Sequence, residues 1–286
     1  MANLSIKQMI EAGVHFGHQS KYWNPKMRPF IYTTYKKLHI INLEKSIIHF
    51  NSAINFIEKL AKNNSNILFV GTKRAARDLI AKYAQESKMP YVNNRWLGGM
   101  LTNFDTVKNS IKKLDSLKAF LSSSNTENMT KKELLVIKKQ IAKLEKNLFG
   151  IKDLEKLPDA LFVIDTKYEK IAIQEANKLN IPVVAIVDSN NSFDGVDYMI
   201  PGNDDSMSSI ELFIKAISET IMKTKGKFSK PVTNKDSVNE KTTTTKSRSI
   251  KKKQVINVEP KQDKPKTRAK KIIKADTDSK KETKKV

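Results

Sequence analysis

The chain contains no cysteine among its 286 residues. This absence excludes disulfide bonds and metal sites built on thiolates, and it fits a protein of a reducing compartment. No apolar run approaches the roughly 18 residues that a membrane-spanning helix requires. The first 13 residues include Glu11 and no long apolar core, so they do not resemble a secretory signal. We therefore expect a cytoplasmic protein that does not engage a membrane.

Arginine is also scarce, although the chain is strongly basic. Only six of the 53 lysine and arginine residues are arginine, and the formal net charge is +23. Residues 231–286 hold 18 basic and 7 acidic residues, a net +11, and the other 230 residues carry +12. Both parts therefore favour a polyanionic partner. Because lysine is a point charge, most phosphate contacts would lack the planar fork that arginine offers.

Short apolar runs alternate with helical patterns over much of the chain. The runs at 67–70, 161–164 and 183–187 are continuously apolar, which is typical of strands buried on both faces. Such alternation predicts a parallel sheet flanked by helices, and we expect a flavodoxin-like α/β fold. Further strands are expected at 91–92 and 198–200, and helices at 46–61, 75–84, 168–179 and 208–222.

Residues 104–149 interrupt this alternation. Apolar side chains there recur at intervals of three and four residues, and a matching stripe precedes them. The pattern predicts an antiparallel coiled-coil hairpin inserted into the α/β domain, with two ordinary helices packed on the sheet as the alternative. The two stripes are Val107, Ile111, Leu114 and Leu121, and Leu134, Ile137, Ile141, Leu144 and Leu148, with a turn expected at 122–125.

Three regions follow from these patterns. Residues 1–103 and 150–226 are expected to form an α/β domain, and residues 104–149 the inserted helical hairpin. Residues 227–286 are rich in Lys, Thr, Ser and Asp, so they cannot bury enough apolar surface to offset the entropy of ordering. We expect a disordered, basic C-terminal tail, with a short helix around its few valines and isoleucines as the alternative.

Two segments combine cations with aromatic side chains. Residues 95–104 set an arginine and a tryptophan beside paired glycines and end in asparagine and phenylalanine. Residues 13–30 alternate Lys and Arg with Tyr, Trp and Phe, and two prolines there disfavour a helix. Cations bind phosphates and aromatic rings stack on bases, so both segments suit a nucleic acid. The alternative for residues 95–104 is that the aromatic side chains simply pack in the core.

These two segments closely resemble the bacterial small-subunit ribosomal protein S2 family. The similarity is collinear from the N-terminus to about residue 225 and does not extend over the tail. Asn94 stands where the family usually has histidine, so no role for a histidine is carried over to that position. Four further motifs carry the resemblance, at Lys37–Lys45, Ile67–Arg74, Leu157–Asp165 and Asp194–Asp205.

The resemblance implies a structural constituent of the small ribosomal subunit, with no enzymatic activity, cofactor or small-molecule substrate. It also implies a helical hairpin and a location on the solvent side near the head–body junction. The implied partners are small-subunit rRNA, neighbouring ribosomal proteins and, where the organism has it, ribosomal protein S1. With the residue types, it predicts that rRNA is bound by Lys21, Tyr22, Trp23, Asn24, Lys26, Arg28, Lys36, Lys37, Lys73, Arg74, Arg77, Arg95, Trp96 and Asn103.

The carboxyl ends of the expected strands leave other functions open. Residues 71–74, Gly-Thr-Lys-Arg, lie between a strand and a helix and suit an rRNA phosphate, a nucleotide or a plain turn, but they are not a Walker loop. Asp165 and Asp188 follow strands where doubly wound folds bind ligands, although capping a turn is the simpler role. A Rossmann-like nucleotide- or metal-dependent enzyme is therefore one competing hypothesis.

Two histidines could join the aspartates at the carboxyl ends of these strands. His15 and His18 would need Asp188 or Asp205 beside them to form a metal site, and a structural hydrogen bond is the commoner role for such residues. The sequence predicts neither a catalytic residue nor a metal site. A second competing hypothesis, prompted by the Lys-rich tail, is a DNA-binding protein.

Overall fold

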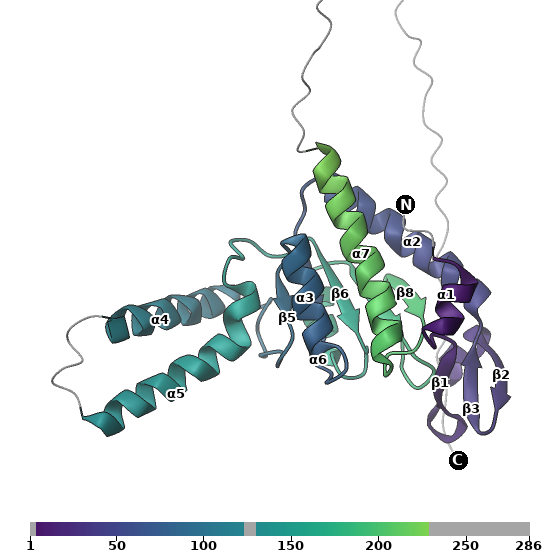
Figure 1. The fold of residues 1–286 in the computed structure, drawn as a ribbon, viewed down its shortest axis with the longest axis horizontal. Coiled ribbons are helices and arrows are strands. Elements are labelled where there is room, and N and C mark those ends of the chain that lie inside the picture. Colours follow the sequence, from purple (N-terminus) through teal and green to yellow (C-terminus); the bar gives the residue numbers. More distant parts are fainter. Residues whose placement is uncertain (1–3, 123–129, 229–286) are drawn as a thin grey trace, which may run out of the picture. The chain divides into compact units, whose positions relative to one another are not determined.

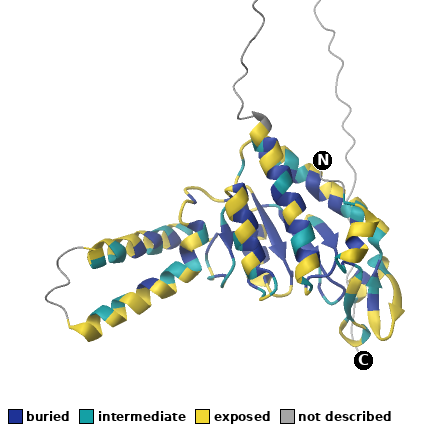
Figure 2. Cartoon of the chain, in the orientation of Figure 1, coloured by how far each residue is buried: buried dark blue, intermediate teal, exposed yellow. Residues whose placement is uncertain are grey.

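The computed structural model describes residues 4–122 and 130–228 (Figure 1). Within them, a five-stranded parallel sheet and a three-stranded antiparallel sheet form the framework. The flanking helices are buried on one side and exposed on the other (Figure 2). Almost all of the predicted tail and of the turn at 122–125 lies outside the described residues, so both stay predictions.

The larger sheet has the strand order β5-β4-β6-β7-β8, and every neighbouring pair is parallel. Counted along the chain, this order is 2-1-3-4-5, which is the flavodoxin-like order. The expected α/β architecture is therefore confirmed. Continuous apolar runs form the central strands because these strands pack against other elements on both faces. The strands are β4 (Ile67–Val70), β5 (Tyr91–Val92), β6 (Ala160–Ile164), β7 (Val183–Val187) and β8 (Tyr198–Pro201).

Two hydrophobic clusters cover the two faces of this sheet. Successive side chains of a strand point to opposite faces, so Phe69 joins the first cluster whereas Leu68 and Val70 join the second. Side chains of α2, α3 and α7 complete the first cluster, and α6 and the loop around Trp96 contribute to the second. Each helix overlaps an expected one: α2 (Leu43–Lys62), α3 (Arg77–Ser87), α6 (Lys170–Lys178) and α7 (Met207–Phe228).

Two helices occupy the predicted insertion and pack against each other. Lys118 and Glu145 join them by an ion pair of 2.8 Å. Val107 and Leu148 lie at their sheet-side ends and belong to the second cluster. The helical content of the insertion is confirmed, while the coiled-coil geometry stays a prediction. The helices are α4 (Phe104–Ser122) and α5 (Lys131–Leu148), and a short 3₁₀ helix, η4 (Phe149–Ile151), follows.

The N-terminal segment contains a small sheet that the sequence pattern did not predict. Its strands have the order β1-β3-β2 and are antiparallel. Residues 13–30, expected to be a loop, form β1 and two 3₁₀ helices. Pro25 takes the first helical position of the second 3₁₀ helix, where its missing N–H costs nothing. We call residues 16–41 the N-terminal ribbon. The elements are α1 (Ile6–Glu11), β1 (Phe16–Gln19), η1 (Ser20–Tyr22), η2 (Pro25–Phe30), β2 (Ile31–Tyr35) and β3 (Leu38–Ile41).

Candidate nucleic-acid interface

The N-terminal ribbon exposes cations beside aromatic rings. The side chains of Tyr22, Tyr32 and Tyr35 are each more than half exposed. Lys21 Nζ lies 4.6 Å from the ring centroid of Tyr22, and Lys36 Nζ lies 5.3 Å from that of Tyr35. These distances permit cation–π contacts. Each pair therefore presents a positive charge and a stacking face together, the combination that binds single-stranded nucleic acid.

The tip of the ribbon consists of two lysines. Lys36 and Lys37 form the two-residue turn between β2 and β3, and Tyr35 pairs with Leu38 across it. Their φ angles are 47° and 65°, in the left-handed region that such hairpin turns usually fill with asparagine and glycine. Lysine is strained there because its Cβ approaches the following carbonyl oxygen. Backbone strain of this kind is often retained at functional sites.

The other predicted residues of the ribbon divide between the surface and the interior. Lys26 and Arg28 are exposed, and Lys26 pairs with Asp194 at 2.6 Å. Trp23 is half-buried, and the Asn24 side chain caps η2 by accepting a backbone hydrogen bond. Asn24 therefore has a structural role whether or not it contacts RNA.

Residues 95–104 fold around one buried carboxylate. Glu175 of α6 accepts five hydrogen bonds of 2.8–3.2 Å through its two oxygens. Trp96 is only 7% exposed and belongs to the second cluster, which matches the core alternative for this ring. The five donors are Trp96 Nε1, the backbone N–H groups of Gly99, Leu101 and Thr102, and the Thr102 hydroxyl.

The charge of Glu175 is held in place by these donors. Burial alone raises the pKa of this carboxyl, but the hydrogen bonds from Gly99, Leu101 and Trp96 outweigh burial and lower the pKa. The carboxylate is therefore a fixed anion that orients the loop. Arg95 opens this loop and is exposed on the surface. The loop thus presents an arginine from a rigid base, as recognition of a phosphate requires.

Lys73 lies within an acidic cluster. Its ammonium group pairs with Asp165 at 3.2 Å, with Asp204 at 2.7 Å, and with Asp205. Burial opposes the charge of Lys73, but the three carboxylates outweigh burial and raise its pKa. Because the ammonium is engaged inside the protein, a phosphate or nucleotide bound by residues 71–74 is disfavoured.

Parallel strands bring the aspartates of this cluster to one edge of the sheet, as the sequence predicts. Asp165 follows β6, Asp188 follows β7 and Asp204 follows β8. Asp165 also accepts two backbone N–H groups of the next turn, which confirms its capping role. Asn191 donates to Asp165 and Asp204 at 3.1 and 2.7 Å. Burial, with the charges of Asp188 and Asp165, raises the pKa of Asp204 to about 7.

His18 closes the cluster from the N-terminal ribbon. Its Nδ1 lies 3.0 Å from Asp188 Oδ2, and its Nε2 lies 3.0 Å from Asp205 Oδ2. The hydrogen bond with Asp188 raises the pKa of His18. The backbone N–H of His18 donates to Ser189 Oγ, which fixes the ribbon on the sheet edge. His15 does not join the cluster, so only one of the two candidate histidines reaches the aspartates.

A cavity of about 380 Å³ lies where β4 and β6 end. The strand order reverses at this point, which is where flavodoxin-like folds bind ligands. Arg77 and Arg95 line the cavity, and Arg77 Nε donates to the Thr72 carbonyl. Glu169 is buried there and accepts from the N–H and hydroxyl of Thr72. Two cations and one acidic side chain therefore meet at the switch point.

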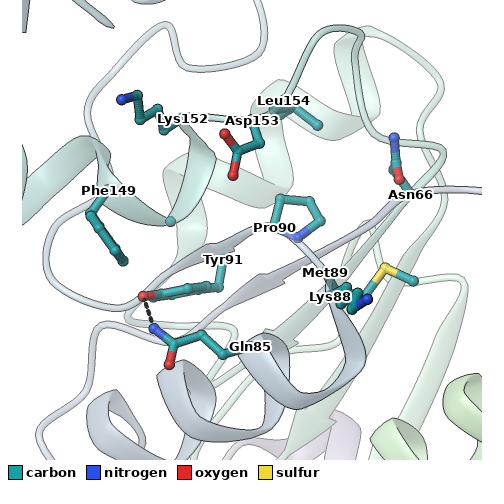
Figure 3. A pocket seen from close by; sticks show the side chains of 11 residues that line it. Asn66, Gln85, Lys88, Met89, Pro90, Tyr91, Phe149, Lys152, Asp153 and Leu154 are labelled. Atoms are coloured by element: carbon teal, nitrogen blue, oxygen red, sulfur yellow. Dashed lines mark hydrogen bonds between the residues drawn. The ribbon is translucent and has the colours of Figure 1, made fainter. Parts of the chain in front are cut away.

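A second cavity, of about 740 Å³, lies at the opposite edge, beside the amino ends of β4 and β5 (Figure 3). Gln85 Nε2 donates to the Tyr91 hydroxyl in its wall. A Cβ on Gly150 would lie 2.2 Å from the Tyr91 carbonyl oxygen, so only glycine permits this approach of η4 to β5. None of the predicted rRNA-binding residues lines this cavity. Of these residues, Arg74 and Asn103 are exposed on the surface elsewhere.

These features define a doubly wound α/β protein with an exposed ribbon of cations and aromatic rings. In the part of the chain that the structure describes, no helix is both long and apolar enough to cross a membrane. A protein-family model described as Ribosomal protein S2 matches residues 9–224. The chain therefore belongs to the ribosomal protein S2 family, whose members are ribosomal proteins of the small subunit and serve translation.

Proposed function

We propose that this protein is a structural constituent of the small ribosomal subunit that binds rRNA through its N-terminal ribbon and the Arg95 loop. The family match supports the role in the small subunit, and the exposed lysine–tyrosine pairs support binding of RNA phosphates and bases. Lysines contact phosphates in this binding mode. Tyr22, Tyr32 and Tyr35 stack on unpaired bases or pack against neighbouring proteins.

The tip of the ribbon carries this proposal. Lys36 and Lys37 hold left-handed backbone conformations that disfavour lysine, and both side chains are exposed. Among the described residues, Lys36 contacts the Tyr35 ring and the Lys37 carbonyl accepts from Ser20 N–H, but neither ammonium group has an acidic partner. A polyanion bound at the tip would offset the cost of these conformations, because two adjacent cations can meet two phosphates.

The sheet edge does not favour the enzyme hypothesis. Lys73 is tied to aspartates, which opposes binding of nucleotide phosphates by residues 71–74. The DNA-binding hypothesis rests on the tail, which lies outside the described residues. Neither hypothesis accounts for the family match over residues 9–224.

Protein partners are proposed from a separate surface. Ile6 and Ile10 of α1 and the neighbouring Phe16 are each at least 43% exposed. Large apolar side chains grouped in this way suit a neighbouring protein better than an RNA backbone. We place small-subunit proteins there in general, and contact with ribosomal protein S1 stays a prediction.

The test replaces the tip without damaging the fold. Lys36→Asn with Lys37→Gly installs the residue pair that this turn prefers, so the free energy of unfolding should stay equal or rise. The same change removes two cations. Binding to small-subunit rRNA should weaken, and the slope of log K against log salt should fall by about 2 if both lysines contact phosphates.

The matched control removes two lysines elsewhere. Lys112→Ala with Lys113→Ala takes the same charge from the exposed face of α4 and should change the salt slope less. A tip variant that is stable and binds rRNA with unchanged affinity and slope would show that the ribbon tip does not contact RNA.

A further inference from the structure

Two arginines in the cavity at the switch point have no acidic partner. Arg77 and Arg95 both line this cavity, and within the described residues neither of them forms an ion pair. Arg77 Nε donates to the Thr72 carbonyl at 2.8 Å, which fixes the guanidinium group in the cavity wall. Both positive charges are therefore available to an anion that enters the cavity.

Glu169 offers an open acceptor in the same cavity. The residue is only 2% exposed, and its Oε1 accepts from the N–H and the hydroxyl of Thr72 at 2.7 and 2.6 Å. Its Oε2 accepts no hydrogen bond from the described part of the chain and stays accessible. Burial raises the pKa of this carboxyl, because the charged form loses its hydration. A ligand that donates hydrogen bonds to Oε2 would therefore stabilise the carboxylate.

The rim of the cavity carries two exposed apolar surfaces. Tyr168 is 60% exposed and Ile171 is 55% exposed, and both residues line the cavity. An aromatic ring and an aliphatic side chain suit the flat face of a base. The volume of about 380 Å³ is near the lower end of the roughly 300–1,000 Å³ of ligand pockets, so it suits one nucleotide.

We propose that this cavity binds one guanosine phosphate, with the guanine base at Glu169 Oε2 and the phosphate at Arg77 and Arg95. Guanine is the RNA base whose Watson–Crick edge carries two adjacent donor groups, the ring N–H and the amino group. A carboxylate oxygen accepts about two hydrogen bonds, so Oε2 can take both. The other RNA bases would turn a ring nitrogen or carbonyl acceptor toward the carboxylate and leave it unpaired.

The walls of the site are held by hydrogen bonds within the protein. Thr72 joins the end of β4 to Glu169 at the start of α6. Asn94 Nδ2 donates to Asn147 Oδ1 at 2.6 Å, which ties the loop before Arg95 to α5. A site fixed in this way loses less conformational freedom when the ligand binds.

An unpaired guanosine of an RNA chain is one source of this ligand, and free guanine nucleotide is the other. The RNA source rests on the proposed function, which places Arg95 at a phosphate of rRNA. The preference for guanine does not rest on it, because that preference comes from Glu169. The two sources present the same base and phosphate, so they are separated by experiment.

The experiment uses the full-length protein freed of nucleic acid, at one fixed salt concentration. Fluorescence anisotropy measures its binding to three labelled oligouridines that differ at one central position, which is guanosine, inosine or adenosine. The guanosine RNA should bind about tenfold more tightly than the adenosine RNA, the range expected of a paired hydrogen-bond contact. Inosine lacks the amino group, so its affinity should lie between the two.

Three variants assign the preference to the cavity. Glu169→Gln keeps the shape and an oxygen for Thr72, and it should abolish the difference between guanosine and adenosine. Glu86→Gln removes the same charge from an exposed position of α3 and should leave that difference unchanged. Tyr168→Ala should weaken binding of all three RNAs by about fivefold or more, because stacking is tolerant of sequence, and should keep their ratio.

Competition identifies the source of the nucleotide. Displacement of the guanosine RNA by guanosine 5′-monophosphate, but not by adenosine 5′-monophosphate, would show that free nucleotide also enters the site. Displacement by neither, with the guanosine RNA still preferred, would assign the site to RNA. Either result supports the guanosine site.

Two results would overturn the inference. One is equal affinity of the wild-type protein for the three RNAs, a comparison that needs no variant. The other is a preference for guanosine that persists in Glu169→Gln protein shown by circular dichroism to be folded. Small-subunit rRNA that still binds in either case would leave the proposed function intact. A protein that prefers guanosine yet does not bind this rRNA would overturn the proposed function alone.

Discussion

At the scale of single residues, Glu175 shows how one buried carboxylate can organise a binding loop. Its two oxygens gather the Trp96 ring N–H, three backbone N–H groups and one hydroxyl. Gly99 serves this arrangement, since it has φ of 88° and its N–H donates to Glu175. The loop is thus held from inside, and Arg95 remains on the outside.

Replacing Glu175 with Gln tests this anchor. The amide NH₂ of glutamine would face donors that now meet an oxygen, so the free energy of unfolding should fall by about 1–3 kcal/mol at pH 7. The pKa of Glu175 is lowered from 4.5 in the folded state, so its stabilising effect is present above about pH 4.5 and is lost as the pH falls through the lowered value. Urea unfolding at several pH values should therefore show the two proteins converging in acid.

Arg95→Ala tests the exposed side of the same loop. If Arg95 makes a desolvated contact with a phosphate, the variant should bind small-subunit rRNA more weakly by about 1–3 kcal/mol. Lys112→Ala, on the exposed face of α4, should cost less. Equal losses for the two variants, or a loss explained by an unfolded Arg95 variant, would refute this ranking.

Several residue-level predictions were limited by what a sequence can show. The composition of residues 95–104 predicts a binding loop, but it does not show that Trp96 is buried or that its partner is Glu175, more than 70 residues further along the chain. The one sequence signal for a buried carboxylate is that Glu175 lies among the apolar residues Ala172, Ile173 and Ala176 of α6. The ion pairs of Lys73 are likewise not visible in the sequence around it. Asp165 and Asp204 follow other strands, and the sheet topology brings them to Lys73.

At the scale of elements, the inner and outer parts of the two insertion helices are packed differently. Val107, Ile111 and Leu148 belong to the second hydrophobic cluster of the sheet. Leu114 and Ile141 are buried but belong to neither cluster, so their burial depends on the two helices themselves. The part of α4 and α5 beyond these residues should therefore unfold separately from the sheet.

Ile141→Asp tests this separation. The substitution puts a charge at a buried position between the helices, which should melt the outer parts of α4 and α5. Hydrogen exchange should show lost protection there and retained protection in β4 and β7. Lys139→Asp, at an exposed position of α5, is the control and should change protection little. Loss of protection throughout the sheet would show that the insertion is part of the core.

Element prediction succeeded where periodicity was strong and failed where turns were atypical. The buried strands and long helices follow from apolar runs and 3.6-residue spacing, and their positions agree closely with the structure. The ribbon was missed because its hairpin turn is Lys36-Lys37, which lacks the Asn-Gly signal of such turns. The feature that hid the hairpin from the sequence is thus the same one that points to its function.

At the scale of the whole molecule, positive charge is divided between two chemically different parts. Residues 1–230 carry +12 together with every Trp, Tyr and Phe, whereas residues 231–286 carry +11 with only two arginines. The tail segment therefore has almost no means of stacking on bases or of fork-shaped recognition. Screened Coulomb attraction is still available to it, which should add affinity without selectivity.

Truncation after residue 230 tests this division. Removing the tail's net charge of +11 should slow association with rRNA. It should also reduce the slope of log K against log salt, because fewer counterions are released on binding. The ratio of affinities for cognate and scrambled rRNA should stay about the same, because the ribbon and the Arg95 loop are retained. Binding curves of both proteins with both RNAs, at 50 and 200 mM salt, measure the two effects separately. A truncated protein that stays folded but no longer discriminates between the RNAs would make the tail the specific reader, and the ribbon would then supply only attraction.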